Sequence, residues 1–223
     1  AKKLLKSESK AIVKKYARSK DIRKWGLLDN NKYFLATGFD LDVKSKYPSA
    51  YSFLSQYERE LKLRQDKGKY WWNLRACAYY PDFEKTKIIY MHTAKDHEFM
   101  IDEEGRYINN SCYMIVSDSK YLFCFLNSKL FKWFKKIKFV AYGDAEGSGR
   151  VKLDYNKMVT VPIKKASKSD QIQFEILVDK ILSVKRANPT ADTSTLESQI
   201  DQLVYQLYGL TEEEIKIVEG VGK

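Results

Sequence analysis

The sequence has few of the residue types that build metal centres and disulfide frameworks. Its 223 residues include only two histidines and three cysteines, and the cysteines are far apart with no CxxC pair. This usage argues against a zinc ribbon or a disulfide scaffold and is typical of a reducing compartment. His92 and His97 are five residues apart, a spacing that does not place two imidazoles on one face of a strand. We therefore expect no metal and no cofactor in this chain.

Long apolar runs are also absent. The most apolar stretch, residues 121–134, is too short to span a bilayer and contains Lys129 and Lys132. No apolar signal segment follows the N-terminal residues. The sequence therefore predicts a soluble, cytoplasmic chain with no membrane partner, in which residues 121–134 form a buried helix.

The motifs of common catalytic centres are missing as well. The sequence contains no GxSxG elbow, no P-loop and no GxGxxG after a strand, and residues 143–150 (GDAEGSGR) lack the spacing of a nucleotide-binding loop. One enzymatic alternative is a stand-alone nuclease in which Asp82, Asp118 and Lys120 form a PD…DxK site for Mg²⁺. However, Pro81-Asp82 is typical of a turn and Asp118 of the start of a helix, so this alternative ranks second.

Basic residues, in contrast, are abundant. Lysine and arginine number 40 against 29 acidic residues, a net charge of +11. Residues 1–168 carry 35 basic and 19 acidic side chains, whereas residues 169–223 carry 5 and 10. The basic part indicates a polyanionic partner, most often nucleic acid, with an anionic membrane as the alternative. We expect the acidic C-terminal part to pack on protein instead: on the basic body, on another domain or on a second copy.

Strand and helix patterns alternate along the basic part. Strands are expected over residues 32–43 (one strand, or two joined at Gly38), 71–77, 87–92, 99–101, 107–116 and 158–163, and helices over residues 48–66 and 119–137, with a glycine-rich loop at 143–149. Pro48 suits the first position of its helix. A linker over residues 164–170 coincides with the change in charge.

The remaining residues have a purely helical pattern. A helix lined by residues 172–182 ends at Asn188-Pro189. A capping box formed by Ser194 and Glu197 starts the next helix, which ends before Gly209, and Thr211 caps a last short helix. The sequence thus predicts an α+β fold, with a mixed β-sheet and packed helices over residues 1–165 and a C-terminal α-helical hairpin over residues 166–223.

Residues 67–75 combine positive charge with aromatic side chains. The segment KGKYWWNLR contains two lysines, an arginine, an asparagine and three aromatic residues. Lysine and arginine neutralise phosphates, and asparagine and arginine can pair with base edges. Trp71 and Trp72 are better explained as core and rim residues than as platforms for base stacking.

The residues around this segment resemble a known family. In chain order they are Tyr47-Pro48, a helix ending at Leu61-Lys62-Leu63-Arg64, residues 68–75, Lys87-Ile88-Ile89-Tyr90, Asn109-Asn110 and residues 121–131. Together they are similar to the TaqI-like C-terminal specificity domain, the target-recognition domain of type IIG restriction enzymes and related N6-adenine DNA methyltransferases. Residues 20–25 (KDIRKW) resemble the family's GRDI-type entry motif, with Ser19-Lys20 where Gly-Arg is usual, and residues 200–210 look like its closing helix.

This resemblance implies a reader of double-stranded DNA sequence over residues 1–165. The chain would be a C-terminal fragment of a type IIG restriction-modification enzyme or N6-adenine DNA methyltransferase that serves in phage defence. The family's methyltransferase domain lies upstream with an (N/D)PPY active site, a motif that this sequence lacks. The chain alone would therefore not be an enzyme. S-adenosylmethionine, and Mg²⁺ where the parent enzyme cleaves DNA, would bind upstream domains of the same polypeptide, which are the expected protein partner.

Two groups of residues are candidates for DNA contact. The predicted phosphate-binding residues cluster near the ends of expected elements in the basic part: Arg64, Lys67, Lys69, Arg75 and Lys87. The predicted base-reading residues lie on polar loops and turns: Lys95, Asp96, His97, Glu98, Arg106 and Arg150. A third hypothesis is a scaffold that binds RNA or single strands by stacking bases on its aromatic residues.

Overall fold

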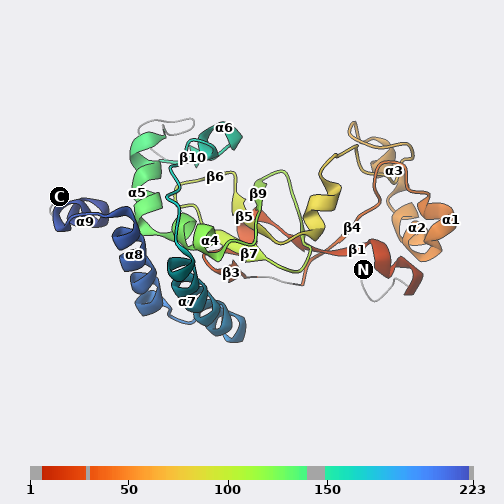
Figure 1. Cartoon of the computed structure of the whole chain (residues 1–223). Helices are drawn as coiled ribbons and strands as arrows, with labels where there is room; N and C mark the ends of the chain where they lie inside the picture. The colour runs from red at the N-terminus through yellow and green to blue at the C-terminus, as the bar shows by residue number, and fades with distance from the viewer. Residues whose placement is uncertain (1–6, 29–30, 140–148, 221–223) are drawn as a thin grey trace. The chain divides into compact units, whose positions relative to one another are not determined.

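The computed structural model describes residues 7–28, 31–139 and 149–220, which fold into two compact units (Figure 1). Unit 1 comprises Ala1–Ala17, Asp29–Lys85 and Glu103–Tyr107, and unit 2 comprises Arg18–Leu28, Thr86–Asp102 and Ile108–Lys223. The chain thus passes repeatedly between the units. The α+β fold class is confirmed, whereas the predicted division at residue 165 stays a prediction.

Unit 1 combines a short antiparallel ladder with small helices. Its elements are η2 (Ser7–Ile12), β1 (Val13–Ala17), β4 (Tyr33–Leu35), α1 (Val43–Lys46), α2 (Pro48–Ser55), α3 (Glu58–Lys62) and η4 (Tyr80–Glu84). β1 pairs with β4, with Lys14 opposite Phe34. Ile12, Val43, Ala50 and Trp72 form its buried core. Pro48 is the first residue of α2, as predicted.

Two predicted elements of unit 1 are shorter in the structure. The strand expected over residues 32–43 ends at Leu35, because Gly38 adopts a left-handed conformation with φ of 57° and Asp42 then caps α1 by accepting a hydrogen bond from the Ser45 backbone N–H. The helix expected over residues 48–66 is divided into α2 and α3 by a turn at Gln56-Tyr57.

Unit 2 is built around a three-stranded antiparallel sheet. β5 (Lys87–Met91) lies between β7 (Phe99–Asp102) and β9 (Cys112–Val116), with Ile88 opposite Ile101 and Ile115. Successive side chains of β5 point to opposite faces, so Ile88 joins one core and Ile89 joins another. The strands predicted over residues 87–92 and 99–101 are confirmed, and the one predicted over 107–116 is divided into β8 (Tyr107–Ile108) and β9.

Very short strands and helices complete the sheet side of unit 2. They are η3 (Ser19–Asp21), the pair β2 (Ile22–Arg23) and β3 (Gly26–Leu27), and the pair β6 (Thr93–Ala94) and β10 (Val151–Lys152). The strand predicted over residues 158–163 is wrong. Asp154 instead caps the short helix α6 (Tyr155–Met158), and the chain turns directly after it.

The longer helices form the rest of unit 2, and the first of them packs against β7. They are α4 (Lys120–Asn127), α5 (Lys129–Lys138), α7 (Lys168–Ala187), α8 (Ser194–Tyr208) and α9 (Glu212–Glu219). The helix predicted over residues 119–137 is interrupted at Ser128, whose backbone is extended and whose hydroxyl accepts a hydrogen bond from the Phe131 N–H. No helix in the described ranges is long and apolar enough to cross a membrane.

The C-terminal helices pack on the body of unit 2. Phe174 and Val178 of α7 and Val204 of α8 share a buried core with Phe123 of α4. This packing confirms one of the three alternatives expected for the acidic segment. α7 begins at Lys168, within the predicted linker, because Ser167 and Asp170 form a capping box.

The expected start of α8 is wrong in detail, and its end is confirmed. Thr193 occupies the N-cap of α8 without a capping side-chain bond, and Glu197 instead accepts hydrogen bonds from the Thr193 hydroxyl and from the Lys24 ammonium. Gly209 adopts the left-handed C-cap conformation, and Thr211 forms the predicted cap of α9 together with Glu214.

An ion pair is buried where β5 meets β7. The Lys87 Nζ lies 2.5 Å from the Asp102 Oδ2, and both side chains are fully buried. We expect Lys87→Met to lower the free energy of unfolding by about 3–5 kcal/mol, because Asp102 would remain as a buried charge without its partner. Urea unfolding measures this loss. The double variant Lys87→Met/Asp102→Leu should recover most of it, and a double variant no more stable than the single one would contradict the explanation.

Candidate nucleic-acid interface

In unit 1, the segment of residues 68–75 is held by side-chain hydrogen bonds and by two backbone bonds to residues 38 and 39, without a strand ladder. Asn73 is fully buried; its Oδ1 accepts a hydrogen bond from the Tyr70 N–H at 2.9 Å, and its Nδ2 donates to the carbonyl oxygens of Thr37 and Leu41 at 2.8 and 3.0 Å. The Thr37 hydroxyl in turn donates to the carbonyl oxygen of Trp72 at 2.8 Å. The segment is thereby fixed against residues 37–41.

Arg64 and Gly68 also hold the segment in place, and we call the contacts of Thr37, Arg64, Gly68 and Asn73 with it the clamp. The guanidinium of Arg64 donates to the carbonyl oxygens of Trp71 and Asn73, both at 2.8 Å. A Cβ atom at Gly68 would lie 2.0 Å from the Phe39 carbonyl oxygen, so only glycine fits there. The strand predicted over residues 71–77 is wrong, because side-chain bonds and two isolated backbone bonds, from Lys69 to Phe39 and from Leu74 to Gly38, satisfy the backbone groups that a strand ladder would pair.

The clamp separates the predicted phosphate-binding residues by role. Lys67, Lys69 and Arg75 are exposed. Lys67 donates to the carbonyl oxygens of Lys62, at the end of α3, and of Arg64, and the Arg75 Nη1 lies 3.8 Å from the Asp66 carboxylate, so both charges remain at the surface. Arg64 is occupied by the loop that it braces.

Lys87 does not fit its predicted role. Its ammonium is fully buried in unit 2 against Asp102, where no phosphate can reach it. The expectation for the tryptophans agrees better with the structure: Trp72 is buried, its indole N–H donates to the Leu41 carbonyl oxygen, and Trp71 is half-buried beside it.

In unit 2, the ladder between β6 and β10 brings two distant segments together. Val151 pairs with Ala94 and Lys152 with Thr93 in antiparallel register. The same register places Arg150 beside Lys95, and a Cβ atom added at Gly149 would lie 3.9 Å from the Lys95 side chain. Lys95, Asp96 and Arg150 are all exposed. Three predicted base-reading residues from two parts of the sequence therefore lie at one edge.

Helix α5 supports this edge from within unit 2. The Lys132 Nζ lies 2.8 Å from the Asp96 Oδ1. The Lys135 Nζ donates to the Lys95 carbonyl oxygen at 2.5 Å and lies 3.2 Å from the His97 Nδ1. A cavity of about 280 Å³, lined by these side chains together with Lys24, Asn127, Ser128 and Lys129, lies between the loop and the helix.

Burial sets the protonation states of this loop. Burial, together with the charge of Lys135, lowers the pKa of His97 to about 3, so the imidazole is neutral. Burial likewise lowers the pKa of Lys135 to about 8. The hydrogen bond from Lys132 and its positive charge hold the pKa of Asp96 below its usual value. Asp96 is therefore a carboxylate within a basic neighbourhood.

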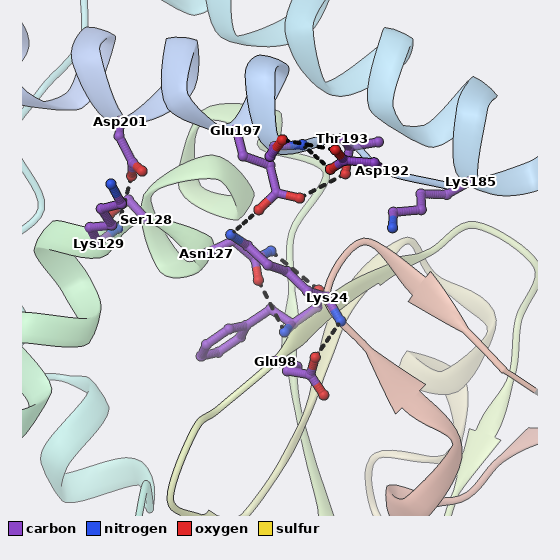
Figure 2. A network of polar contacts seen from close by, with 12 residues as sticks. Lys24, Glu98, Asn127, Ser128, Lys129, Lys185, Asp192, Thr193, Glu197 and Asp201 are labelled. Carbon is purple, nitrogen blue, oxygen red and sulfur yellow. Dashed lines mark hydrogen bonds and ion pairs between the residues drawn. The ribbon is translucent and has the colours of Figure 1, made fainter. Parts of the chain in front are cut away.

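Figure 2 shows the polar network that anchors the other end of the loop. The Glu98 carboxylate accepts a hydrogen bond from the Lys24 backbone N–H at 3.2 Å, and the Lys24 ammonium reaches Glu197 at 2.5 Å. The Asn127 Oδ1 accepts a hydrogen bond from the Phe99 N–H, and its Nδ2 donates one to the Phe99 carbonyl oxygen, both at 3.2 Å. Glu98 therefore serves the fold here.

Two further predicted base readers are not presented at the surface. His97 is turned toward Lys135 in unit 2. Arg106, in unit 1, is only 5% exposed and its guanidinium contacts Glu104 at 2.6 Å. Lys95, Asp96 and Arg150 thus remain the predicted base-reading residues with exposed side chains. The glycine-rich loop before Arg150 lies at 140–148, outside the described residues.

Two of the three predicted nuclease residues form ion pairs with other partners. Lys120 forms an ion pair with Asp179 at 2.7 Å, and Asp82 pairs with Lys85 at the same distance. Within residues 7–28, 31–139 and 149–220, no three His, Cys, Asp or Glu side chains are grouped as metal ligands would be.

Sequence reasoning missed the lysines of α5 as part of the site. The sequence predicts residues 121–134 only as a buried helix, although lysines recur at positions 129, 132 and 136 of the observed α5, opposite apolar residues. That spacing was the available signal.

Comparisons with known proteins identify one family and a set of similar solved structures. The family model "TaqI-like C-terminal specificity domain" matches residues 14–163. A search of curated proteins gave no significant match. Among solved structures, 17 chains match, and one of them is the type IIL restriction-modification enzyme MmeI in complex with DNA, with a TM-score of 0.62 and 13% identity. That alignment covers 95% of this chain and 30% of the MmeI chain, and at this identity it shows the fold alone.

The buried Lys135 makes a pH-dependent contribution to stability. Its pKa is about 8 in the folded protein against its usual 10.5, so between these values the unfolded chain binds more protons at this site, and stability rises with pH. Between pH 7.5 and 9.5 we expect wild-type protein to gain about 2 kcal/mol of unfolding free energy relative to Lys135→Met. Urea titrations at the two pH values test this. Lys136→Met, exposed on the same helix, is the control and should follow the wild type; equal pH dependence in Lys135→Met would contradict the prediction.

Proposed function

Because the chain belongs to the family of TaqI-like C-terminal specificity domains, we propose that it recognises a specific sequence in double-stranded DNA. The match of the family model to residues 14–163 is the observation that carries this proposal. The chain spans about 30% of the MmeI chain, which suits a recognition part of a larger restriction-modification enzyme or N6-adenine DNA methyltransferase. Such a domain is a non-catalytic module of its enzyme.

The division of labour within the parent enzyme follows from this role. Methyl transfer to an adenine requires the base to leave the duplex stack. A methyltransferase domain of the same polypeptide would bind S-adenosylmethionine and perform that step, and Mg²⁺ would be needed only where the parent enzyme also cleaves. This chain would hold the duplex in register for its catalytic partner.

The exposed cations of unit 1 suit the phosphate backbone. Lys67, Lys69 and Arg75 extend from a segment that Asn73 and Arg64 clamp from below. Rigid presentation reduces the entropy lost when charged side chains bind. Phosphate contacts of this kind fix the register of a protein on DNA without reading its sequence.

The exposed edge of unit 2 suits base reading. A two-stranded ribbon such as β6–β10 fits the major groove of B-form DNA. An arginine can donate two hydrogen bonds to guanine, and a carboxylate can accept one from the amino group of cytosine. Arg150, next to β10, and Asp96, in the loop after β6, offer these two chemistries from exposed positions at the same end of this ladder.

Salt dependence tests the phosphate contacts. If six to eight phosphates are contacted, the logarithm of duplex affinity should fall with the logarithm of salt concentration with a slope of about −5 to −7. Fluorescence anisotropy between about 50 and 200 mM salt measures this slope. Lys69→Gln and Arg75→Gln should each reduce the magnitude of this slope by about 1. Lys180→Gln, which removes an exposed charge from the outer side of α7, should leave the slope unchanged. A flat salt dependence in the wild type would count against duplex binding.

Selection from a random duplex library tests the base readers. We expect the wild-type chain to enrich one sequence, and Asp96→Asn or Arg150→Ala to relax the preference at one or two positions by about 1–3 kcal/mol per base pair. The slope against salt should change little in Asp96→Asn, because no phosphate contact is lost. Competition by single-stranded RNA and incubation of plasmid with Mg²⁺ decide the two alternatives. Stronger binding to RNA, or cleavage that Asp118→Ala abolishes, would replace the proposal.

A further inference from the structure

The outer face of α5 carries a row of lysines. Lys129, Lys132 and Lys136 are spaced by three and four residues, so they lie on one side of the helix over about 10 Å. The side chains of Lys129 and Lys132 are 49% and 68% exposed, and Lys136 is exposed as well. We name these three residues the α5 row.

The helix beneath the α5 row is firmly fixed. Leu130 and Phe131 on its inner face belong to the main core of unit 2, and Ser128 caps its first turn. Lys135 ties its middle to the loop at Lys95. The row is therefore presented by a rigid element rather than by a loop, as a precise binding surface requires.

The three lysines differ in how their charge is compensated. Lys129 is paired with Glu219 at 2.9 Å and Lys132 with Asp96 at 2.8 Å. Lys136 has no hydrogen bond or ion pair with any of the described residues. Because Asp96 belongs to the exposed edge beside Lys95, the Lys132–Asp96 pair makes the α5 row continuous with that edge.

We propose that the α5 row is a second phosphate-binding surface, in which Lys132 and Lys136 contact backbone phosphates beside the bases that the β6–β10 edge reads. This inference rests on the proposed function and deepens it. On contact, Lys132 exchanges the Asp96 carboxylate for a phosphate oxygen. The exchange releases the Asp96 carboxylate to accept a hydrogen bond from a base, so that phosphate binding and base reading are coupled.

A basic helix face could also bind an anionic lipid surface, and Ile137, which is 62% exposed, lies next to the row. We favour DNA as the partner because the Asp96 carboxylate within this surface would weaken binding to a uniformly anionic membrane. A base edge, in contrast, can donate a hydrogen bond to that carboxylate. The membrane is accordingly one of the outcomes of the test.

The experiment measures duplex affinity of the 223-residue chain against salt concentration. The variants are Lys136→Gln and Lys132→Gln/Lys136→Gln, and the matched control Lys168→Gln/Lys180→Gln removes two exposed charges from α7. The single variant should reduce the magnitude of the slope by about 1 and the double variant by about 2, while the control keeps the wild-type slope. Thermal melting should be unchanged in all three, and Lys136→Gln carries the test alone if the double variant does not fold.

The outcomes separate this inference from the function on which it rests. A wild-type chain without salt-dependent duplex binding would overturn both. Salt-dependent binding with the same slope in wild type, Lys136→Gln and the double variant would overturn only the role of the α5 row, as would a loss no larger than that of the control. Co-sedimentation with phosphatidylserine vesicles that the double variant abolishes, combined with an unchanged duplex slope, would assign the row to membranes instead.

Discussion

Unit 2 depends on the burial of strand β5 on both of its faces. Ile88 and Tyr90 enter the main core, while Ile89 enters a second core with Ile22 and Met100. A strand enclosed in this way has one acceptable register, because a shift by one residue would exchange its two faces and displace the Lys87–Asp102 pair. The chain leaves β5 directly into β6 and the exposed loop that follows, so the register of the buried strand determines where Lys95 and Asp96 emerge. Precision at the candidate interface therefore originates in the core.

Both candidate surfaces use the same device to make an irregular segment rigid. In unit 1, Asn73 and Arg64 bond the backbone of Tyr70 and Asn73 within the 68–75 segment. In unit 2, Lys135 bonds the Lys95 carbonyl oxygen in the loop after β6, and Asn127 bonds the backbone of Phe99, where β7 begins. Buried backbone groups without a strand partner need other partners, and polar side chains supply them. Charged residues are consequently divided between two tasks. Those whose side chains point inward hold the loops, and those on the outer side are available for a partner.

This division explains what the sequence could and could not predict. β5, β7 and the C-terminal helices were predictable because their apolar periodicity reflects a large buried face. The aromatic residues of the predicted strand 71–77 favoured a strand, but the Asn73 amide nitrogen bonds residues more than 30 positions away, and no local pattern reveals these two bonds. The β6–β10 ladder consists of two-residue strands separated by more than 50 residues, which is why the proximity of Lys95 and Arg150 emerged only from the structure. Among the predicted phosphate-binding residues, Lys67, Lys69 and Arg75 are exposed, as phosphate contact would require, whereas Lys87 is buried in an ion pair with Asp102.

The net charge alone indicates a protein that binds any polyanion, whereas the ion pairs within the basic part favour a protein that distinguishes one DNA sequence from another. A surface of lysines binds every duplex with similar strength, because phosphates are identical along the strand. A carboxylate placed among those lysines weakens that uniform attraction and favours only a partner that can donate a hydrogen bond to it at that point. Asp96 is a carboxylate of this kind, paired with Lys132 among the lysines, and under the proposed function a phosphate would displace it from Lys132. The acidic residues within the basic part are thus as informative about sequence recognition as the excess of positive charge around them.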